Sequence, residues 1–345
     1  MRILLRAAAV ALGIMISPQG WEAALAQDAP GRADYEAAAG YSARHGGLAL
    51  VVSQGGQIVF EDYRKGTGPD DALPLASGTK AFWCAAYAAG VADGLFTADT
   101  PVVEELQEWA SDPLKREITV GELLNLTSGL DIGFEELRQG EREDIYALAL
   151  QIPSRSRPGE EFLYAPSHMT AFGAFLSRRL NGESPLAYLE RRVLDPIGLD
   201  VGRWRTDLAG NPGMAAGAFL TAREWLKYGQ LLAGGGVWAG RQILPEAALA
   251  DCREGSRANP MFGFGFWLNS GIDPAIASRQ YNPVRPDDVV DGHIAPNAPR
   301  DLFLAIGARN QRLYVIPSLD IVAVRYGKQD GTWHDHEFLD LLLGN

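Results

Sequence analysis

Leu48-Ala-Leu-Val-Val-Ser-Gln-Gly-Gly-Gln-Ile-Val-Phe-Glu-Asp-Tyr63 holds two apolar runs on either side of a Gly-Gly pair. The pattern predicts a β-hairpin, because alternation places apolar side chains on one face and the Gly-Gly pair forms the tight turn. An amphipathic stretch from Asp34 to about His45 predicts a helix directly before it.

The rest of the chain changes from helical to strand-like spacing. Apolar residues recur at helical spacing in Ala81 to Ala92, Val120 to Leu126, Met169 to Leu180, Leu186 to Leu194 and Ala222 to Leu232. Strand-like runs follow at Phe262 to Leu268, Leu302 to Ile306, Arg312 to Ile316 and Ile321 to Tyr326, before a last helix from His336 to Leu343. Strands at both ends predict an α+β fold, in which one antiparallel sheet from both chain ends is flanked by helices and carries an inserted, mostly helical lobe.

The first 26 residues have the three parts of a secretory signal. Arg2 and Arg6 give a basic start, an apolar stretch follows, and Ala24-Leu-Ala26 is an A-x-A cleavage site. We expect a single domain over 27–345, with a sheet lobe of about 32–75 and 260–345 and a helical lobe of about 76–255. The mature protein is expected to be periplasmic or secreted, with no stable membrane anchor.

Composition excludes two classes of protein. Of the 345 residues, 47% are hydrophobic, which rules out disorder as the main state. The net charge of −12, with no basic block, makes nucleic acid a poor partner and leaves a small molecule as the expected one.

Cys84 and Cys252 are too few for a disulfide framework. They are expected to be buried free thiols, although their pairing is left open.

Ser77-Gly-Thr-Lys80 is the motif that carries chemistry. Its serine and lysine stand at i and i+3 at the expected start of a helix, so they share one face. A serine hydroxyl is a weak nucleophile until a base removes its proton, and a lysine desolvated by burial can be that base or relay the proton. No G-x-S-x-G, H-E-x-x-H, Walker or dinucleotide motif occurs, so the α/β-hydrolase class and cofactor binding are not expected.

Further motifs follow in order along the mature chain. They include Ile118-Thr-Val-Gly-Glu-Leu-Leu-Asn-Leu-Thr-Ser-Gly-Leu130, Pro158-Gly-Glu-Glu-Phe-Leu-Tyr164, Tyr188-Leu-Glu-Arg-Arg-Val-Leu-Asp-Pro-Ile-Gly-Leu199 and Gln311-Arg-Leu-Tyr-Val-Ile-Pro-Ser-Leu-Asp-Ile-Val-Ala-Val324. With the S-x-x-K they resemble the serine β-lactamase and penicillin-binding-protein superfamily, and most closely its class C β-lactamase and esterase branch. The resemblance implies a β-lactamase/transpeptidase-like fold.

The resemblance also implies site residues. Ser77 resembles the acylating nucleophile, Lys80 its proton-relay partner and Tyr164 the general base, the last only if Lys80 lowers the pKa of its hydroxyl. The backbone N–H groups of Ser77 and Ala308 would form the oxyanion hole.

The sequence departs from the family pattern at two motifs. Tyr-x-Asn is replaced by Tyr164-Ala-Pro166, where either Ser167 or His168 could stand in for the missing asparagine, or neither. Lys-Thr-Gly is replaced by Ala305-Ile-Gly307, which keeps the glycine and loses the cation that would bind a β-lactam carboxylate. Both losses weaken the assignment as an antibiotic-hydrolysing enzyme.

Other candidate residues have two interpretations each. Arg309 either meets an acidic group of the substrate or is a solvated turn residue. His293, in the proline-rich stretch from Asn269 to Arg300 that we expect at the pocket rim, either lines the pocket or is an ordinary loop histidine. His334-Asp-His336 lacks a third ligand at suitable spacing, so no metal site is expected.

The sequence therefore predicts an exported serine hydrolase that forms an acyl-enzyme on Ser77 and hydrolyses esters or small amides. The alternatives are a β-lactamase or D-amino-acid peptidase, or a non-catalytic ligand-binding or sensor protein with this fold. Intact Ser77, Lys80 and Tyr164 argue against the last of these.

Overall fold

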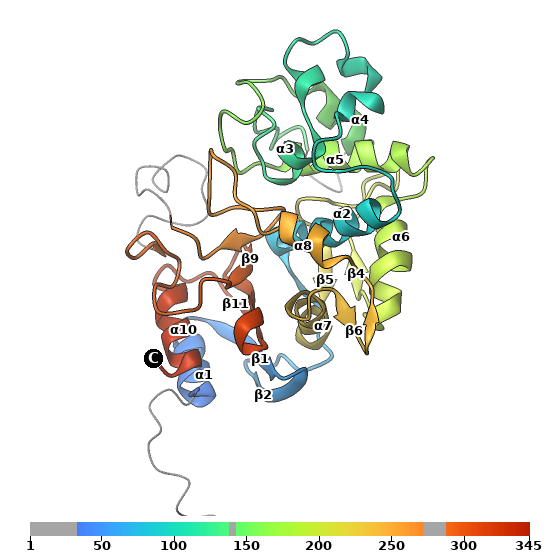
Figure 1. The fold of residues 1–345 in the computed structure, drawn as a ribbon. Helices are drawn as coiled ribbons and strands as arrows, with labels where there is room; N and C mark the ends of the chain where they lie inside the picture. The colour runs from blue at the N-terminus through green and yellow to red at the C-terminus, as the bar shows by residue number, and fades with distance from the viewer. Residues whose placement is uncertain (1–32, 138–142, 272–287) are drawn as a thin grey trace, which may run out of the picture.

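A six-stranded antiparallel sheet forms the centre of the computed structural model, which describes residues 33–137, 143–271 and 288–345 (Figure 1). The strand order is β2-β1-β11-β10-β9-β8. Their bounds are β1 Gly47–Gln54, β2 Gln57–Tyr63, β8 Trp267–Leu268, β9 Phe303–Gly307, β10 Gln311–Ile316 and β11 Ile321–Gly327. Both ends of the chain thus supply the sheet, which confirms the expected α+β fold. The expected signal segment lies outside the described residues.

The predicted hairpin forms, and it joins the C-terminal strands through β1. Gln54 pairs with Gln57 across the Gly55-Gly56 turn, and Val51 of β1 pairs with Val324 of β11. β10 and β11 are buried along their whole length. Strands buried on both faces need continuous apolar runs rather than alternation, and the C-terminal strand sequences have this pattern.

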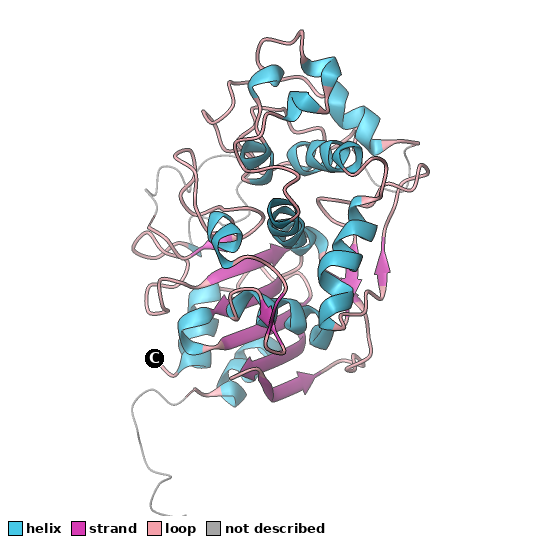
Figure 2. Cartoon of the chain, turned by 45° about the vertical axis from the view of Figure 1, so that its right-hand side comes forward, coloured by secondary structure: helices cyan, strands magenta, loops and turns pink. Residues whose placement is uncertain are grey.

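Helices cover both faces of the sheet (Figures 1 and 2). α1 (Tyr35–Arg44) and α10 (Asp335–Leu343) pack together on one face, and α7 (Ala222–Ala233) packs against β1, β10 and β11 on the other. Thr221 caps the N-terminus of α7, and its side chain accepts a hydrogen bond from the Glu224 backbone N–H. The sheet core is therefore closed to water on both sides.

The segment between β3 and β8 is mostly helical. Its longer helices are α2 Phe82–Ala92, α3 Val120–Leu124, α4 Ile145–Gln151, α5 Pro166–Arg179, α6 Pro185–Leu189 and α8 Glu246–Asp251. Its short turns are η2 Ala76–Ala81, η3 Val102–Glu104, η4 Gln107–Trp109, η5 Lys115–Glu117, η6 Glu190–Leu194 and η7 Asp195–Ile197, and η9 Pro317–Leu319 joins β10 to β11. Its small strands are β3 Leu73–Pro74, β4 Arg203–Trp204, β5 Ala218–Leu220, β6 Val237–Trp238 and β7 Arg241–Gln242. Over the described ranges, no helix has the length and apolar character that crossing a bilayer requires.

The strand predicted from Phe262 to Leu268 is wrong over most of its length, because only Trp267 and Leu268 are extended in the sheet. Gly265 has φ +84°, and a Cβ there would lie 2.4 Å from the Lys80 carbonyl oxygen. The chain therefore turns at this glycine and passes against the S-x-x-K segment. Phe262 lies opposite Trp267 in an isolated antiparallel bridge, and the centroids of the two rings are 5.0 Å apart.

The two cysteines are buried as expected, but the expectation of free thiols is wrong. Cys84 of α2 and Cys252, which follows α8, form a disulfide with Cα atoms 5.8 Å apart. The bond spans 168 residues of sequence, and both side chains are 1% exposed. Helical spacing correctly turns Cys84 inward, but only the packing of α8 on α2 brings its partner there.

Because a disulfide restricts the unfolded chain, we expect its removal to lower the free energy of unfolding by about 2–5 kcal/mol. Denaturant unfolding with and without dithiothreitol measures the loss. The Cys84→Ala, Cys252→Ala double variant is the control and should not respond to the reductant. Equal stability of the wild-type protein in both conditions would contradict the pairing.

Candidate active site

The Ser77-Gly-Thr-Lys80 motif lies on η2, which links the small strand β3 to α2. The expected helix start is a 3₁₀ turn, in which side chains three residues apart eclipse one another. Lys80 Nζ consequently donates a hydrogen bond to Ser77 Oγ over 3.1 Å, and a second to the Ala215 carbonyl oxygen over 3.1 Å. Ala76, just before the serine, has φ +49°, a left-handed conformation that costs a non-glycine residue about 1 kcal/mol or more.

Lys80 is buried without a counter-charge. Its side chain is 3% exposed, and no carboxylate of the described residues lies within ion-pair distance of it. Burial penalises the charged ammonium and lowers the pKa of Lys80 to about 7. At neutral pH a large fraction of Lys80 is therefore the free amine, which is able to take a proton from Ser77.

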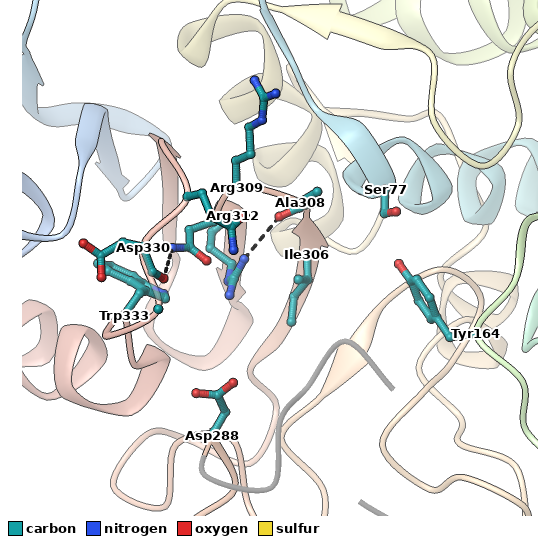
Figure 3. A pocket seen from close by; sticks show the side chains of 13 residues that line it. Ser77, Tyr164, Asp288, Ile306, Ala308, Arg309, Arg312, Asp330 and Trp333 are labelled. Atoms are coloured by element: carbon teal, nitrogen blue, oxygen red, sulfur yellow. Dashed lines mark hydrogen bonds between the residues drawn. The ribbon is translucent and has the colours of Figure 1, made fainter. Parts of the chain in front are cut away.

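Tyr164 faces Ser77 across the same site (Figure 3). The Lys80 Nζ lies 4.6 Å from its ring centroid, and the rings of Phe262 and Trp267 pack around it at 5.9 Å. Burial raises the pKa of Tyr164 to about 12, while a hydrogen bond with Ser77 and the charge of Arg312 act in the lowering direction. The condition for a base role, that Lys80 lower this pKa, is not met, because desolvation by burial is the largest cause and Lys80 is not among the groups that lower it. Tyr164 is a neutral hydroxyl at neutral pH.

β9 ends against Leu75, two residues before Ser77. A Cβ at Gly307 would lie 2.0 Å from the Leu75 carbonyl oxygen, so only glycine allows this approach. The contact brings Ala308 beside Ser77, and both line a cavity of about 370 Å³ together with Tyr164. Gly307 and Arg309 line it as well. The two residues expected to supply oxyanion N–H groups thus border one cavity, as an oxyanion site requires.

The cavity contains a buried arginine that sequence reasoning did not single out. Arg312 of β10 stands opposite Ile306 of β9 and donates two hydrogen bonds to Asp335, over 2.8 and 3.0 Å. Ala305, in the place of the family lysine, is fully buried and does not line the cavity. The available signal was an arginine directly before the apolar run Leu313 to Ile316, since a charge buried with that run needs a buried partner.

Three candidate binding residues lie elsewhere. Pro166 begins α5 and turns Ser167 into the core, where its side chain is fully buried and its Oγ has no hydrogen-bond partner among the described residues. His168 is buried too: its Nδ1 lies 2.7 Å from Ser128 Oγ, and burial lowers its pKa to about 3. His293 is half-buried, its Nδ1 lies 2.8 Å from the Asp291 carbonyl oxygen, and it does not line the cavity.

Residues 288–300 of the proline-rich stretch contribute Asp288 to the cavity, while residues 272–287 lie outside the described chain (Figure 3). Asp288 Oδ1 lies 3.2 Å from His334 Nδ1. The cavity thus holds carboxylates as well as arginines, because Asp330 also lines it.

The chain matches the sequence profile of the Beta-lactamase family over residues 28–341. No curated protein matches it in a sequence search. Three similar solved structures are EstCE1, a hydrolase with promiscuous acyltransferase activity; a penicillin-binding protein homologue from Caulobacter crescentus; and a D-stereospecific amidohydrolase from Streptomyces sp.. Their identities are 17, 16 and 16%, and their TM-scores 0.67, 0.65 and 0.61. The alignments cover 90, 90 and 94% of this chain and 97, 96 and 96% of the other chains. At these identities the likeness shows a shared fold.

The lowered pKa of Lys80 predicts how Ser77 reactivity depends on pH. We expect the rate at which a fluorophosphonate probe labels Ser77 to fall about tenfold per pH unit below pH 7 and to level off above it, because the amine accepts the proton only when it is uncharged. Labelling rates between pH 5 and 9 give the midpoint. A midpoint above pH 9 would contradict the assignment, and Lys80→Arg, which stays charged, should label slowly at every pH.

Proposed function

The chain belongs to the beta-lactamase family of hydrolases, and on that premise we propose that it forms an acyl-enzyme on Ser77 and hydrolyses esters or small amides. The observation that carries this proposal is the hydrogen bond of 3.1 Å between Ser77 and a buried lysine whose pKa is about 7. The lysine gives the serine a base at neutral pH, and Ser77 itself borders a cavity that is large enough for a small molecule.

In the acylation step, Lys80 in its amine form accepts the Ser77 proton as Oγ bonds to the substrate carbonyl carbon. The negative charge that develops on the carbonyl oxygen is stabilised by the backbone N–H groups of Ser77 and Ala308. The tetrahedral intermediate then collapses and the bond to the leaving group breaks. Lys80 carries one proton more than before.

Tyr164 supplies the proton that the leaving group needs. With a pKa of about 12 its hydroxyl is protonated, so it donates to the departing alkoxide or amine, and the Lys80 ammonium returns a proton to it. Hydrolysis of the acyl-enzyme reverses these transfers with water as the nucleophile. The proposal therefore makes Lys80 the base and Tyr164 the shuttle, in place of the base role expected from the family pattern.

Esters and small amides are favoured over β-lactams for a structural reason. Ala305 gives the third-motif strand no cation, and Arg312, the buried arginine beside it, is bonded to both oxygens of Asp335. Pro166 offers no side-chain amide at the second motif. Two contacts that the family uses to orient a β-lactam are thus missing, and hydrogen bonds to charged groups contribute about 1.5–3 kcal/mol each.

We also propose that the protein is exported. The signal pattern of residues 1–26 and the disulfide Cys84–Cys252 both support this, because disulfides persist in oxidising compartments.

The nucleophile and shuttle roles predict the behaviour of two variants. Ser77→Ala should abolish hydrolysis of p-nitrophenyl acetate and labelling by the fluorophosphonate probe, with an unchanged circular dichroism spectrum. Tyr164→Phe should lower kcat by about 10²- to 10⁴-fold, because only the proton-carrying oxygen is lost. More than about one thousandth of the wild-type rate in Ser77→Ala would reject the nucleophile.

Substrate choice separates the proposal from a β-lactamase or a D-amino-acid peptidase. We expect kcat/KM for the best short-chain p-nitrophenyl ester to exceed that for nitrocefin and benzylpenicillin by about tenfold or more, because the third-motif strand has no cation to hold the β-lactam carboxylate. Steady-state kinetics with one enzyme preparation provide the comparison. Equal or faster turnover of a β-lactam would show that other groups orient it.

A further inference from the structure

A second hollow, of about 250 Å³, adjoins the catalytic cavity. Ala308 and Arg309 line both spaces. On its other sides the hollow is bordered by Ala76, the neighbour of Ser77, and by Arg205 and Phe219. We call this hollow the arginine groove. The groove therefore extends to the residue next to Ser77 in the chain and shares two lining residues with the catalytic cavity.

The charge of the arginine groove is uniformly positive, unlike that of the catalytic cavity. Its lining includes Arg205 and Arg309 and contains neither Asp nor Glu, whereas Asp288 and Asp330 line the cavity. Neither groove arginine has an ion-pair partner among the described residues. Figure 3 shows the Arg309 side chain extending away from Asp288 and Arg312.

Arg205 is placed at the groove by the aromatic ring of Phe219. Its guanidinium lies 4.9 Å from the ring centroid, and that of Arg203, two residues earlier, lies 4.1 Å from it. The Arg205 backbone N–H is bonded to the Gly217 carbonyl oxygen over 3.0 Å beside β5. Stacking on a ring orients a guanidinium while leaving its N–H groups free to bind an anion.

We propose that the arginine groove binds a carboxylate of the substrate, so that Arg205 and Arg309 make the enzyme selective for esters or amides that carry a free carboxylate group. The proposal rests on the acyl-enzyme function and names its substrate class. The guanidinium groups that line the groove each offer a fork of N–H donors, which suits a planar carboxylate. No Asp or Glu lines the groove, so no carboxylate of its lining competes with a substrate carboxylate for the two arginines.

Matched substrates test the proposal. One pair carries the charge on the acyl group, p-nitrophenyl hydrogen glutarate against its methyl ester; the other carries it on the leaving group, 4-acetoxybenzoate against methyl 4-acetoxybenzoate. We expect the wild-type protein to prefer the carboxylate in at least one pair, measured as the ratio of kcat/KM values. Arg205→Ala and Arg309→Ala should each lower that ratio by about fivefold or more, and a glutamate at either position should reverse the preference.

Arg241, exposed on β7, provides the matched control, because Arg241→Ala should leave both ratios unchanged. A wild-type preference for the neutral member of both pairs would overturn the proposal. So would ratios that stay within twofold of the wild-type values in both groove variants.

A binding measurement keeps this test separate from the proposed function. The Ser77→Ala protein is titrated with monomethyl glutarate and dimethyl glutarate by calorimetry, which requires no turnover. Tighter binding of the acid, weakened about fivefold by adding Arg205→Ala, supports the groove even if esters are not hydrolysed. Equal binding of the two glutarates by the Ser77→Ala protein would overturn the groove, while turnover of neutral esters would still support the acyl-enzyme.

Discussion

Burial of the Lys80 ammonium is the constraint on which the rest of the site depends. Lys80 is kept from water, and its only hydrogen-bond partners among the described residues are Ser77 and the Ala215 carbonyl, so it is easily deprotonated. The fold maintains this burial from two directions: Gly265 brings the backbone against Lys80, and the rings of Phe262 and Trp267 pack around Tyr164 beside it. The aromatic segment that looked like a strand thus forms the apolar surroundings that the base requires.

Close backbone packing builds the other half of the site. Gly307 allows the end of β9 to touch Leu75, which sets Ala308 beside Ser77, and the positive φ of Ala76 fixes the serine at the start of its 3₁₀ turn. Neither feature depends on a reactive side chain. The proposed oxyanion site is made from backbone N–H groups and therefore does not need the family lysine, because its donors are supplied by the fold.

Local sequence patterns predicted the helices and strands well, but they predicted poorly which distant residues meet in the fold. Alternation and helical spacing placed the β1–β2 hairpin, the C-terminal strands and most helices, since each depends on a period within a single segment. They failed from Phe262 to Leu268, where Gly265 turns the chain, and for Cys84, whose partner is 168 residues away. The family resemblance offered Ser167 as one possible binding residue, although Pro166 directs it into the core.

By itself the sequence determined the reactive groups, which are an S-x-x-K motif at an expected helix start and a tyrosine downstream. It also determined that the strands of the sheet come from both ends of the chain. Tertiary structure decided how those groups ionise and what surrounds them. The pKa values of Lys80 and Tyr164 depend on desolvation by segments distant in sequence, and the arginines reach the site from β10, from the turn after β9 and from the residue after β4. Solvation and charge proximity are properties of three-dimensional packing, so no local sequence pattern encodes them.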